Sequence, residues 1–355
     1  MRLAFICWTP LHIINILNVI NTYYRNEKKD LYVYAEFSGA EVYYQRLKEM
    51  HVFEDVFFVK PEKMGNFFQR KFSLVTGKSK MTNILKVSYD QMFIQGENYF
   101  SKILFSSMRK KNPNIYFNYI EDGIGAYLSD QIFSTSINKQ RLLNLVNPHS
   151  IFLQKAHFSY VYRPDLLMLK RDNIRRIPTI KKDSIIDEQI RFIFGVNSLD
   201  YVRKSIVYFD QPLENDGFGI NEADIAEKVK QYNKLKKRFF VKLHPRNHST
   251  KKYYKNEMLE SQLPFEVLIL ENDFSDTILL SPLSTIAFSP LLMFDQPMKS
   301  IFLPKLLLNT YNEAIPLEKK VILGKLIDFC NAFNKVSESK VFLPETWEEL
   351  ERDLR

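Results

Sequence analysis

A histidine stands at the end of an apolar run in the second half of the chain, between two basic residues. The run 238–246 reads Arg-Phe-Phe-Val-Lys-Leu-His-Pro-Arg, and its aromatic and β-branched residues favour a strand. Pro245 has no N–H for a central ladder, so the strand must stop at His244. Ligands of open α/β sheets bind at the carboxyl ends of strands, where an imidazole flanked by Lys242 and Arg246 suits an anion. A histidine that only caps a loop is equally compatible with this stretch alone.

Carboxylates follow two other stretches that read as strands. Glu121, Asp122 and Gly123 come directly after 115–120, and the glycine permits a tight turn or the close approach of a ligand. An acidic turn follows the strand expected over 205–209 and holds three carboxylates, Asp210, Glu214 and Asp216. Such groups can take a proton from a hydroxyl. The carboxylates of the acidic turn could instead have no function and simply be exposed to solvent. Glu121 and Asp122 could instead stabilise the turn and cap the N-terminus of a helix.

Two hydroxyl residues, Ser284 and Thr285, precede an apolar run over 286–294 that reads as a buried helix. The free N–H groups and the dipole at the start of a helix attract phosphate, so both hydroxyls are natural donors to an anion. Ordinary helix capping is the alternative explanation.

Strands and helices alternate from the start of the chain. Such an alternation can place the candidate site residues described above at the ends of parallel strands. After a strand over 2–8, Thr9 supplies an N-cap oxygen and Pro10 the first helical position, and a helix follows to about residue 24. Further strands are expected over 31–37, 52–59, 103–105, 239–244, 265–270 and, last, 300–303, and helices over 40–50, 222–235 and 346–354. This alternation predicts an α/β protein with parallel sheets covered by helices on both faces.

With 355 residues the chain exceeds one ordinary core and suggests two domains. Charged residues, Pro178 and the sequence Lys181-Lys182-Asp183 indicate a connection, so domains are expected over 1–180 and 181–355. The last helix is a candidate to pack back on the first domain.

Composition narrows the class of protein further. Two cysteines, Cys7 and Cys330, lie far apart with no metal-ligand spacing near either, so neither a disulfide framework nor a metal site is expected and a reducing cytoplasm fits. The apolar segment 3–20 is interrupted by His12, Asn15 and Asn18, which argues against a signal peptide, and no stretch is long enough to span a membrane.

Basic residues gather over 60–111, where eleven lysines and arginines face three carboxylates, within a net charge of +9. Such a stretch can hold an anionic membrane surface, a phosphorylated substrate or nucleic acid. No nucleic-acid-binding module is recognisable, so nucleic acid is not expected as a partner. One interpretation is that these basic residues are simply exposed to solvent. The next one we consider is that they dock the protein on the inner face of the cell membrane.

Taken together and in order, the motifs resemble those of bacterial sialyltransferases, most closely glycosyltransferase family 52, which includes lipooligosaccharide and capsule enzymes. The resemblance rests on five short motifs that span most of the chain: Phe5-Ile6-Cys7-Trp8-Thr9-Pro10-Leu11-His12, Glu121-Asp122-Gly123-Ile124-Gly125, Gln211-Pro212-Leu213, His244-Pro245-Arg246 and Ser284-Thr285.

That resemblance implies a GT-B-like fold of two Rossmann-like domains facing across a central cleft. It further implies an inverting transfer of sialic acid from CMP-sialic acid to a hydroxyl, with galactose expected as the acceptor and with neither a metal nor a cofactor. The first domain would then serve the acceptor, with Glu121, Asp122 and Gly123 on that side. The second would bind the donor through one set of residues: His244, Pro245, Arg246, Lys242, Ser284 and Thr285.

The chain differs from this family at the residue proposed as the catalytic base. The lipooligosaccharide enzymes carry the proposed basic aspartate directly after the proline of the acidic turn, where this chain has Leu213. Glu214, Asp216 or Asp210 must therefore replace it, or the base lies elsewhere, and we expect Glu214 to act with His244.

Two other functions stay open on the residues. One is a GT-B transferase that uses another nucleotide sugar in capsule synthesis, and the other is a non-catalytic peripheral membrane binder. The expected partners are a nucleotide-sugar donor, a glycan or lipid-linked glycan acceptor, an anionic membrane surface and, as an open alternative, a second copy of the chain in a homodimer.

Overall fold

The chain is represented by a computed structural model that describes residues 1–78, 85, 87–129, 132–133, 135–169, 171–195, 199, 202–244, 246, 254, 257–259, 261 and 263–355. It divides into two compact units. Unit 1 comprises 1–178 with 183–195, and unit 2 comprises 179–182 with 196–355. The boundary expected at 180/181 lies within 179–182, which groups with unit 2, whereas 183–195, expected in the second domain, groups with unit 1.

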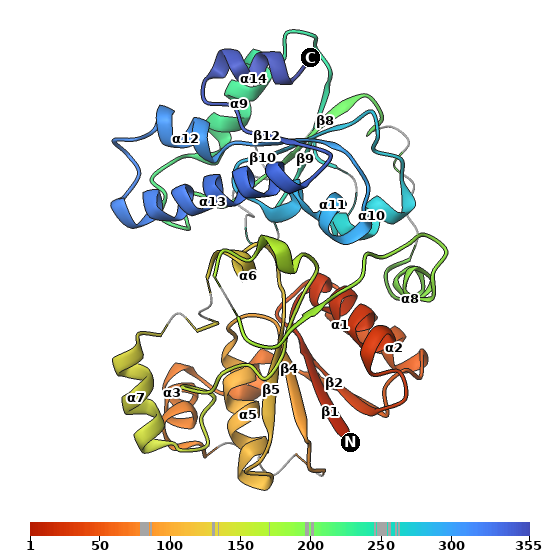
Figure 1. Cartoon of the computed structure of the whole chain (residues 1–355), viewed down its shortest axis with the longest axis vertical. Helices are drawn as coiled ribbons and strands as arrows, with labels where there is room; N and C mark the ends of the chain where they lie inside the picture. The colour runs from red at the N-terminus through yellow and green to blue at the C-terminus, as the bar shows by residue number, and fades with distance from the viewer. Residues whose placement is uncertain are drawn as a thin grey trace. The chain divides into compact units, whose positions relative to one another are not determined.

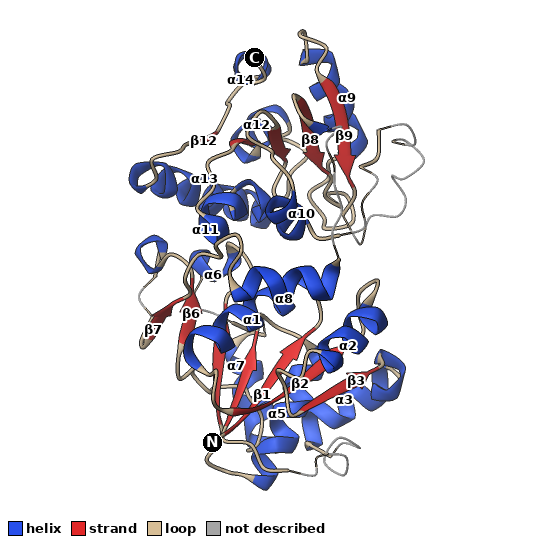
Figure 2. Cartoon of the chain, turned by 90° about the vertical axis from the view of Figure 1, so that its right-hand side faces the viewer, coloured by secondary structure: helices blue, strands red, loops and turns tan. Residues whose placement is uncertain are grey.

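Unit 1 is built on a parallel sheet of seven strands in the order β3-β2-β1-β4-β5-β6-β7. Figure 2 shows β3, β2 and β1 side by side in this sheet. Its strands are β1 (Arg2–Cys7), β2 (Lys28–Tyr34), β3 (Asp55–Val59), β4 (Gln91–Ile94), β5 (Tyr116–Ile120), β6 (Ser159–Val161) and β7 (Ile174–Arg176). The strand order reverses between β1 and β4. In a doubly wound sheet, ligands bind beyond the carboxyl ends of the strands at such a reversal.

Helices cover both faces of this sheet (Figure 1). They are α1 (Pro10–Tyr23), α2 (Ala40–Glu49), η1 (Pro61–Met64), α3 (Phe67–Thr76), α5 (Tyr99–Lys111), α6 (Gly125–Leu128), α7 (Ile137–Val146), η2 (Pro164–Leu166) and α8 (Ile185–Phe194). α1 and α2 lie on one face and α5 on the other. As expected, Thr9 caps α1 by accepting the His12 N–H at 3.3 Å, with Pro10 at the first helical position. Because both faces are covered, residues 3–7 of β1 are fully buried and read as one continuous apolar run.

Unit 2 contains a second parallel sheet, in the order β12-β11-β10-β8-β9. Its strands are β8 (Ser205–Phe209), β9 (Arg238–Lys242), β10 (Ile278–Ser281), β11 (Lys299–Phe302) and β12 (Val341–Phe342). The first strand in sequence, β8, lies between β9 and β10. The order therefore reverses between β8 and β10, which places a second binding crevice at the carboxyl ends of these two strands.

The helices of unit 2 also form two layers (Figure 1). They are α9 (Glu222–Tyr232), α10 (Phe265–Glu271), η5 (Thr285–Ala287), α11 (Ser289–Phe294), α12 (Pro304–Thr310), α13 (Leu317–Val336) and α14 (Trp347–Asp353). α9 and α14 cover one face of the sheet, and α10, α11 and α13 the other. The closing helix α14 packs on α9 of its own unit, where Trp347 stacks on Tyr232 with 5.4 Å between ring centroids.

Several elements differ from the sequence-based expectation. Residues 103–105 and 265–270, expected as strands, lie in the helices α5 and α10. Within these two stretches every residue is buried, so no exposed polar side chain marks a helical period there. The strand near 300–303 is not the last, because β12 follows it. The helix expected over 286–294 is divided into η5 and α11.

The expected α/β class with two Rossmann-like domains is confirmed, since each unit holds a parallel sheet with helices on both faces. Among the described residues, no helix has the length and apolar character to cross a bilayer.

Candidate functional site

Three strand ends meet at one edge of the unit 2 sheet. Phe209 of β8 pairs with Lys242 of β9, and Tyr208 pairs with Leu280 of β10. The residues that follow these strands, beginning at 210, 243 and 282, therefore emerge side by side. The sequence-predicted acidic turn, the histidine motif and the hydroxyl pair thus share the binding edge of unit 2.

His244, Arg246 and Asp216 form a connected cluster at this edge. The Arg246 guanidinium donates hydrogen bonds to both Asp216 carboxylate oxygens, at 2.9 and 3.0 Å. The Arg246 backbone N–H donates to His244 Nδ1 at 3.2 Å. One arginine thereby holds the acidic turn and the histidine together. Pro245, which was expected to help bind the donor, lies outside the described residues.

The histidine in this cluster is neutral at physiological pH. Burial and then the nearby Arg246 charge lower the pKa of His244 to about 4, against a raising effect of Asp216. A neutral imidazole that accepts a hydrogen bond at Nδ1 carries its hydrogen on Nε2. His244 therefore presents an N–H donor from Nε2.

Lys242, which was expected to bind the donor, is partly buried and bonds to the protein itself. Its ammonium donates a 2.5 Å hydrogen bond to the Ser261 carbonyl, and burial lowers its pKa to about 8 while Glu266 partly opposes this. Glu266 is itself 7% exposed, and burial raises its pKa. The sequence did not indicate Glu266 as a site residue, because it lies in the helix that reads as a strand.

The hydroxyl pair starts a single turn of 3-10 helix. Ser284 is the N-cap of η5, and its Oγ accepts the Ile286 N–H at 3.4 Å. Its own backbone N–H donates to Ser281 Oγ at 2.6 Å. The Thr285 carbonyl accepts the Phe288 N–H at 2.9 Å. Ser284 thus has the capping role that was the alternative for this motif, at a place beside the β8–β10 reversal.

The three candidate carboxylates of the acidic turn have different surroundings. Asp210 is 1% exposed, and its backbone N–H bonds the Lys242 carbonyl at 3.0 Å. Glu214 is exposed, and its backbone N–H donates to Glu222 Oε2 at 3.3 Å. Only Asp216 acts as a charge on His244 among the described carboxylates. The structure therefore brings Asp216, rather than Glu214, to the histidine.

Leu213, at the place of the family's basic aspartate, points into the core. Its side chain is 2% exposed, and its carbonyl accepts the Phe218 N–H at 2.9 Å within the turn. A carboxylate at this place would be buried in unit 2. The departure from the family pattern is thus accommodated by apolar packing.

In unit 1, Glu121 follows β5 and is 3% exposed. Its Oε2 accepts the Tyr127 hydroxyl at 2.5 Å and the Tyr162 N–H at 2.7 Å. Burial raises the pKa of Glu121 to about 8, although both hydrogen bonds act in the opposite direction. Glu121 therefore ties β5 to the segments that follow β5 and β6.

Asp122 lies next on this turn and, unlike Glu121, reaches solvent. Its Oδ1 accepts the Tyr119 hydroxyl at 2.9 Å, and the protein packed around it raises its pKa. Gly96, after β4, adopts a φ of 75°, and a Cβ there would lie 2.2 Å from Asp122 Oδ2. Gly123 adopts a φ of 132°, which L side chains rarely accept. Gly96 thus makes room for this carboxylate, and Gly123 allows the backbone turn that follows it.

Residues that the sequence did not single out line the same edge of unit 1. Asn15 Nδ2 donates to the Glu121 carbonyl at 2.8 Å, and Gln95 Nε2 donates to the His12 carbonyl at 3.0 Å. His12 accepts the Trp8 N–H at Nδ1, and burial lowers its pKa to about 3. The polar positions inside the first apolar helix, first noted as interruptions of a signal-like segment, were the signal for this group.

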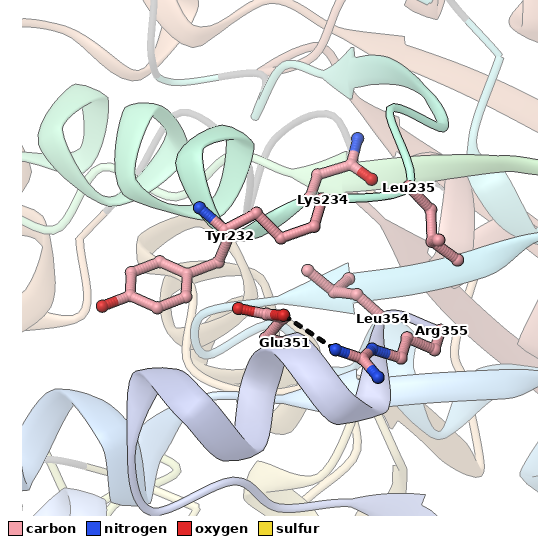
Figure 3. Close-up of a pocket in the computed structure, with 7 residues that line it drawn as sticks. Tyr232, Lys234, Leu235, Glu351, Leu354 and Arg355 are labelled. Atoms are coloured by element: carbon pink, nitrogen blue, oxygen red, sulfur yellow. Dashed lines mark hydrogen bonds and ion pairs between the residues drawn. The ribbon is translucent and has the colours of Figure 1, made fainter.

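A shallow surface hollow, open to solvent, lies away from these edges, between the end of α9 and α14 (Figure 3). The loop that lines it precedes β9, so the hollow belongs to the amino end of that strand. We do not assign it to the reaction. Across the described part of the chain, no group of three or more histidine, cysteine or acidic residues is arranged to hold a metal ion.

The chain matches one protein family over most of its length. The family described as Alpha-2,8-polysialyltransferase (POLYST) matches residues 4–286. No curated protein sequence matches. The expected resemblance to bacterial sialyltransferases is thereby confirmed.

Solved structures share the fold at low sequence identity. A 2,6-sialyltransferase from Photobacterium sp. JT-ISH-224, solved with CMP and lactose, is 12% identical, with 98% of this chain and 78% of that chain covered and a TM-score of 0.54. The UDP-GlcNAc 2-epimerase of Methanocaldococcus jannaschii is 14% identical, with 100% and 92% covered and a TM-score of 0.52. At these identities the likeness establishes the GT-B type of fold alone.

Proposed function

From the membership of this chain in the alpha-2,8-polysialyltransferase family, which makes it a glycosyltransferase, we propose a specific reaction. The enzyme transfers sialic acid from CMP-sialic acid to a hydroxyl of a bacterial surface glycan. The observation that carries the donor assignment is the cluster of His244, Arg246 and Asp216 at the β8–β10 edge of unit 2. It presents an N–H donor and a guanidinium group, the latter paired with Asp216, where doubly wound folds bind nucleotides.

His244 and Arg246 serve the phosphate of the donor in this proposal. As the bond between the anomeric carbon and the phosphate oxygen breaks, the electron pair and negative charge pass to CMP. The Nε2–H of His244 donates to that phosphate, and Arg246 neutralises part of its charge. The reaction proceeds with inversion and without an essential metal. Ser284 and Thr285 supply further polar groups next to the phosphate.

The acceptor hydroxyl loses its proton to a carboxylate as its oxygen attacks the anomeric carbon. Asp122 suits this step best, because its side chain reaches solvent beside the turn after β5, where an acceptor hydroxyl can approach it. Asp216 is held by Arg246, and Glu214 has an exposed side chain. Both remain candidates, with Glu214 the one favoured by the sequence, and the variants described in the Discussion distinguish them.

Two acceptors are supported by different observations. Galactose follows from the sequence resemblance, and the Photobacterium sialyltransferase was solved with lactose. The family's description instead points to the 8-hydroxyl of a terminal sialic acid. Parallel transfer assays with lactose and with a sialylated oligosaccharide, each with CMP-sialic acid, identify which one this chain uses.

A thermal-shift panel with CMP, UDP, GDP and ADP, run once with a chelator and once with a divalent metal ion, tests the donor. CMP should raise the melting temperature, because a ligand that binds only the folded state stabilises it. A GT-B transferase with another nucleotide sugar is the competing function, since the fold alone does not select the nucleotide. A shift with UDP that needs a divalent metal, with none for CMP, would establish that alternative.

A further inference from the structure

Large apolar side chains gather on the outside of two short helices of unit 1, α3 and α7. Of the 21 exposed large apolar side chains found among the described residues, seven lie on these two helices: Phe67, Phe68, Phe72, Ile137, Leu142, Leu145 and Val146. Neither helix has a buried residue. A third of such side chains within 20 residues exceeds the scattered exposure that is normal for a soluble protein.

The two helices are fixed side by side against α5 (Figure 1). Asn147 ends α7 and donates hydrogen bonds both to the Leu74 carbonyl of α3 and to Ser106 of α5, each at 3.1 Å. Lys110 of α5 donates to the Gly77 carbonyl that ends α3. Only Leu74 and Leu143 turn toward the core of unit 1. The exposed apolar residues are therefore presented on a supported surface.

Helical spacing places these residues in rows. Phe68 and Phe72 are four residues apart on α3, and Leu142 is followed at three and four residues by Leu145 and Val146 on α7. The most exposed are Leu145, at 81%, and Phe68, at 78%. Each helix thus directs one apolar row away from the protein.

Basic residues accompany the apolar rows. Over 61–78 and 137–146 the sequence holds six basic residues and one acid, Glu62, and five of the basic residues are exposed: Lys63, Lys71, Lys78, Lys139 and Arg141. Lys71 lies over the Phe67 ring at 4.2 Å from its centroid, so charge and aromatic surface are interleaved. A second copy of the chain would bring the same positive charges against these, which disfavours a symmetric dimer here.

We propose that this α3–α7 surface, made of the seven apolar and five basic residues named above, docks on an anionic lipid bilayer. Aromatic and leucine side chains enter the boundary between headgroups and acyl chains, while lysine and arginine contact anionic headgroups. The sequence indicated only three of the basic residues of this surface, Lys63, Lys71 and Lys78, within the stretch 60–111. The apolar part identifies a bilayer rather than a soluble anion as its partner. The proposal is independent of the donor and acceptor assignments.

The test is sedimentation of the full chain with vesicles of phosphatidylcholine, with or without phosphatidylglycerol. Wild type should bind the anionic vesicles at low salt and bind less as salt screens the charges. The double variant Phe68→Ser/Phe72→Ser should bind at least about tenfold more weakly, because it lacks two apolar anchors. The triple variant Lys71→Gln/Lys139→Gln/Arg141→Gln should lose the preference for anionic vesicles.

Phe192→Ser is the matched control, because this phenylalanine is 49% exposed on α8, outside the surface. It should bind like wild type. CMP-induced thermal shifts should be unchanged in all variants, which separates this result from the donor assignment. Equal binding of Phe68→Ser/Phe72→Ser and wild type would disprove the proposal. So would a wild-type dimer that this variant converts to a monomer, since the surface would then join two copies.

Discussion

The Arg246 guanidinium donates hydrogen bonds to both carboxylate oxygens of Asp216, at 2.9 and 3.0 Å, although thirty positions separate the two residues. The pair joins the acidic turn after β8 to the loop after β9. Because the same arginine donates its backbone N–H to His244, the pair also fixes the histidine's hydrogen-bonding state. A substitution of Asp216 should therefore change both the position and the pKa of the His244 imidazole.

Asp216→Asn should lower the pKa of His244 below its value of about 4, because the variant removes a negative charge that raises it. The Asp216 side chain is 34% exposed and its partner Arg246 is 64% exposed, so the free energy of unfolding should change by no more than about 1 kcal/mol. An NMR pH titration of the His244 ring measures the first effect and denaturant unfolding the second. An unchanged imidazole pKa would show that Asp216 does not act on His244 in solution.

His244→Ala should lower kcat on the order of a hundredfold or more, because the departing phosphate loses its N–H donor. The imidazole lies on a loop at the strand end, so the melting temperature without ligand should change little. His149→Ala is the control, since this histidine lies outside both candidate sites. Steady-state transfer assays with CMP-sialic acid measure the effect. Turnover within a factor of two of wild type would exclude His244 from the reaction.

The base is identified by comparing Asp122→Asn, Glu214→Gln and Asp216→Asn. We expect Asp122→Asn to cost at least about a hundredfold in kcat while CMP still raises the melting temperature, because the variant removes proton acceptance and leaves the donor cluster intact. Glu214→Gln should stay near wild type. The reverse result, with Glu214→Gln inactive and Asp122→Asn active, would support the sequence-based choice instead.

The strand ends were predictable because strands leave local signals. β8 and β9 are rich in β-formers and end at an acidic turn and at proline, so His244 and Asp210 could be placed at a sheet edge from the sequence. The same logic placed Glu121 directly after β5. The chemistry at a strand end is thus readable when the strand itself is.

Long-range partners left no such signal. The Arg246–Asp216 pair and the contact of Glu121 with the Tyr162 N–H join segments whose proximity is set only by sheet order. Residues 103–105 and 265–270 were taken for strands because complete burial removes the polar face that marks a helix. The sequence did not reveal the exposed apolar rows of α3 and α7, because apolar residues in a sequence are expected to face the core rather than solvent.

The last prediction concerns the pH dependence of stability at Glu121. Its pKa is raised to about 8 in the folded chain, above the ordinary value near 4.5 that applies after unfolding. Between these values the folded state binds more protons than the unfolded state, so this residue's contribution to stability falls as pH rises. Glu121→Gln cannot ionise, and its amide oxygen can still accept from Tyr127 and Tyr162. The unfolding free energy of wild type minus that of Glu121→Gln should therefore decrease from pH 4.5 to pH 8, as measured by denaturant unfolding at each pH. A difference that stays constant or grows with pH would mean that Glu121 is ionised in the folded protein.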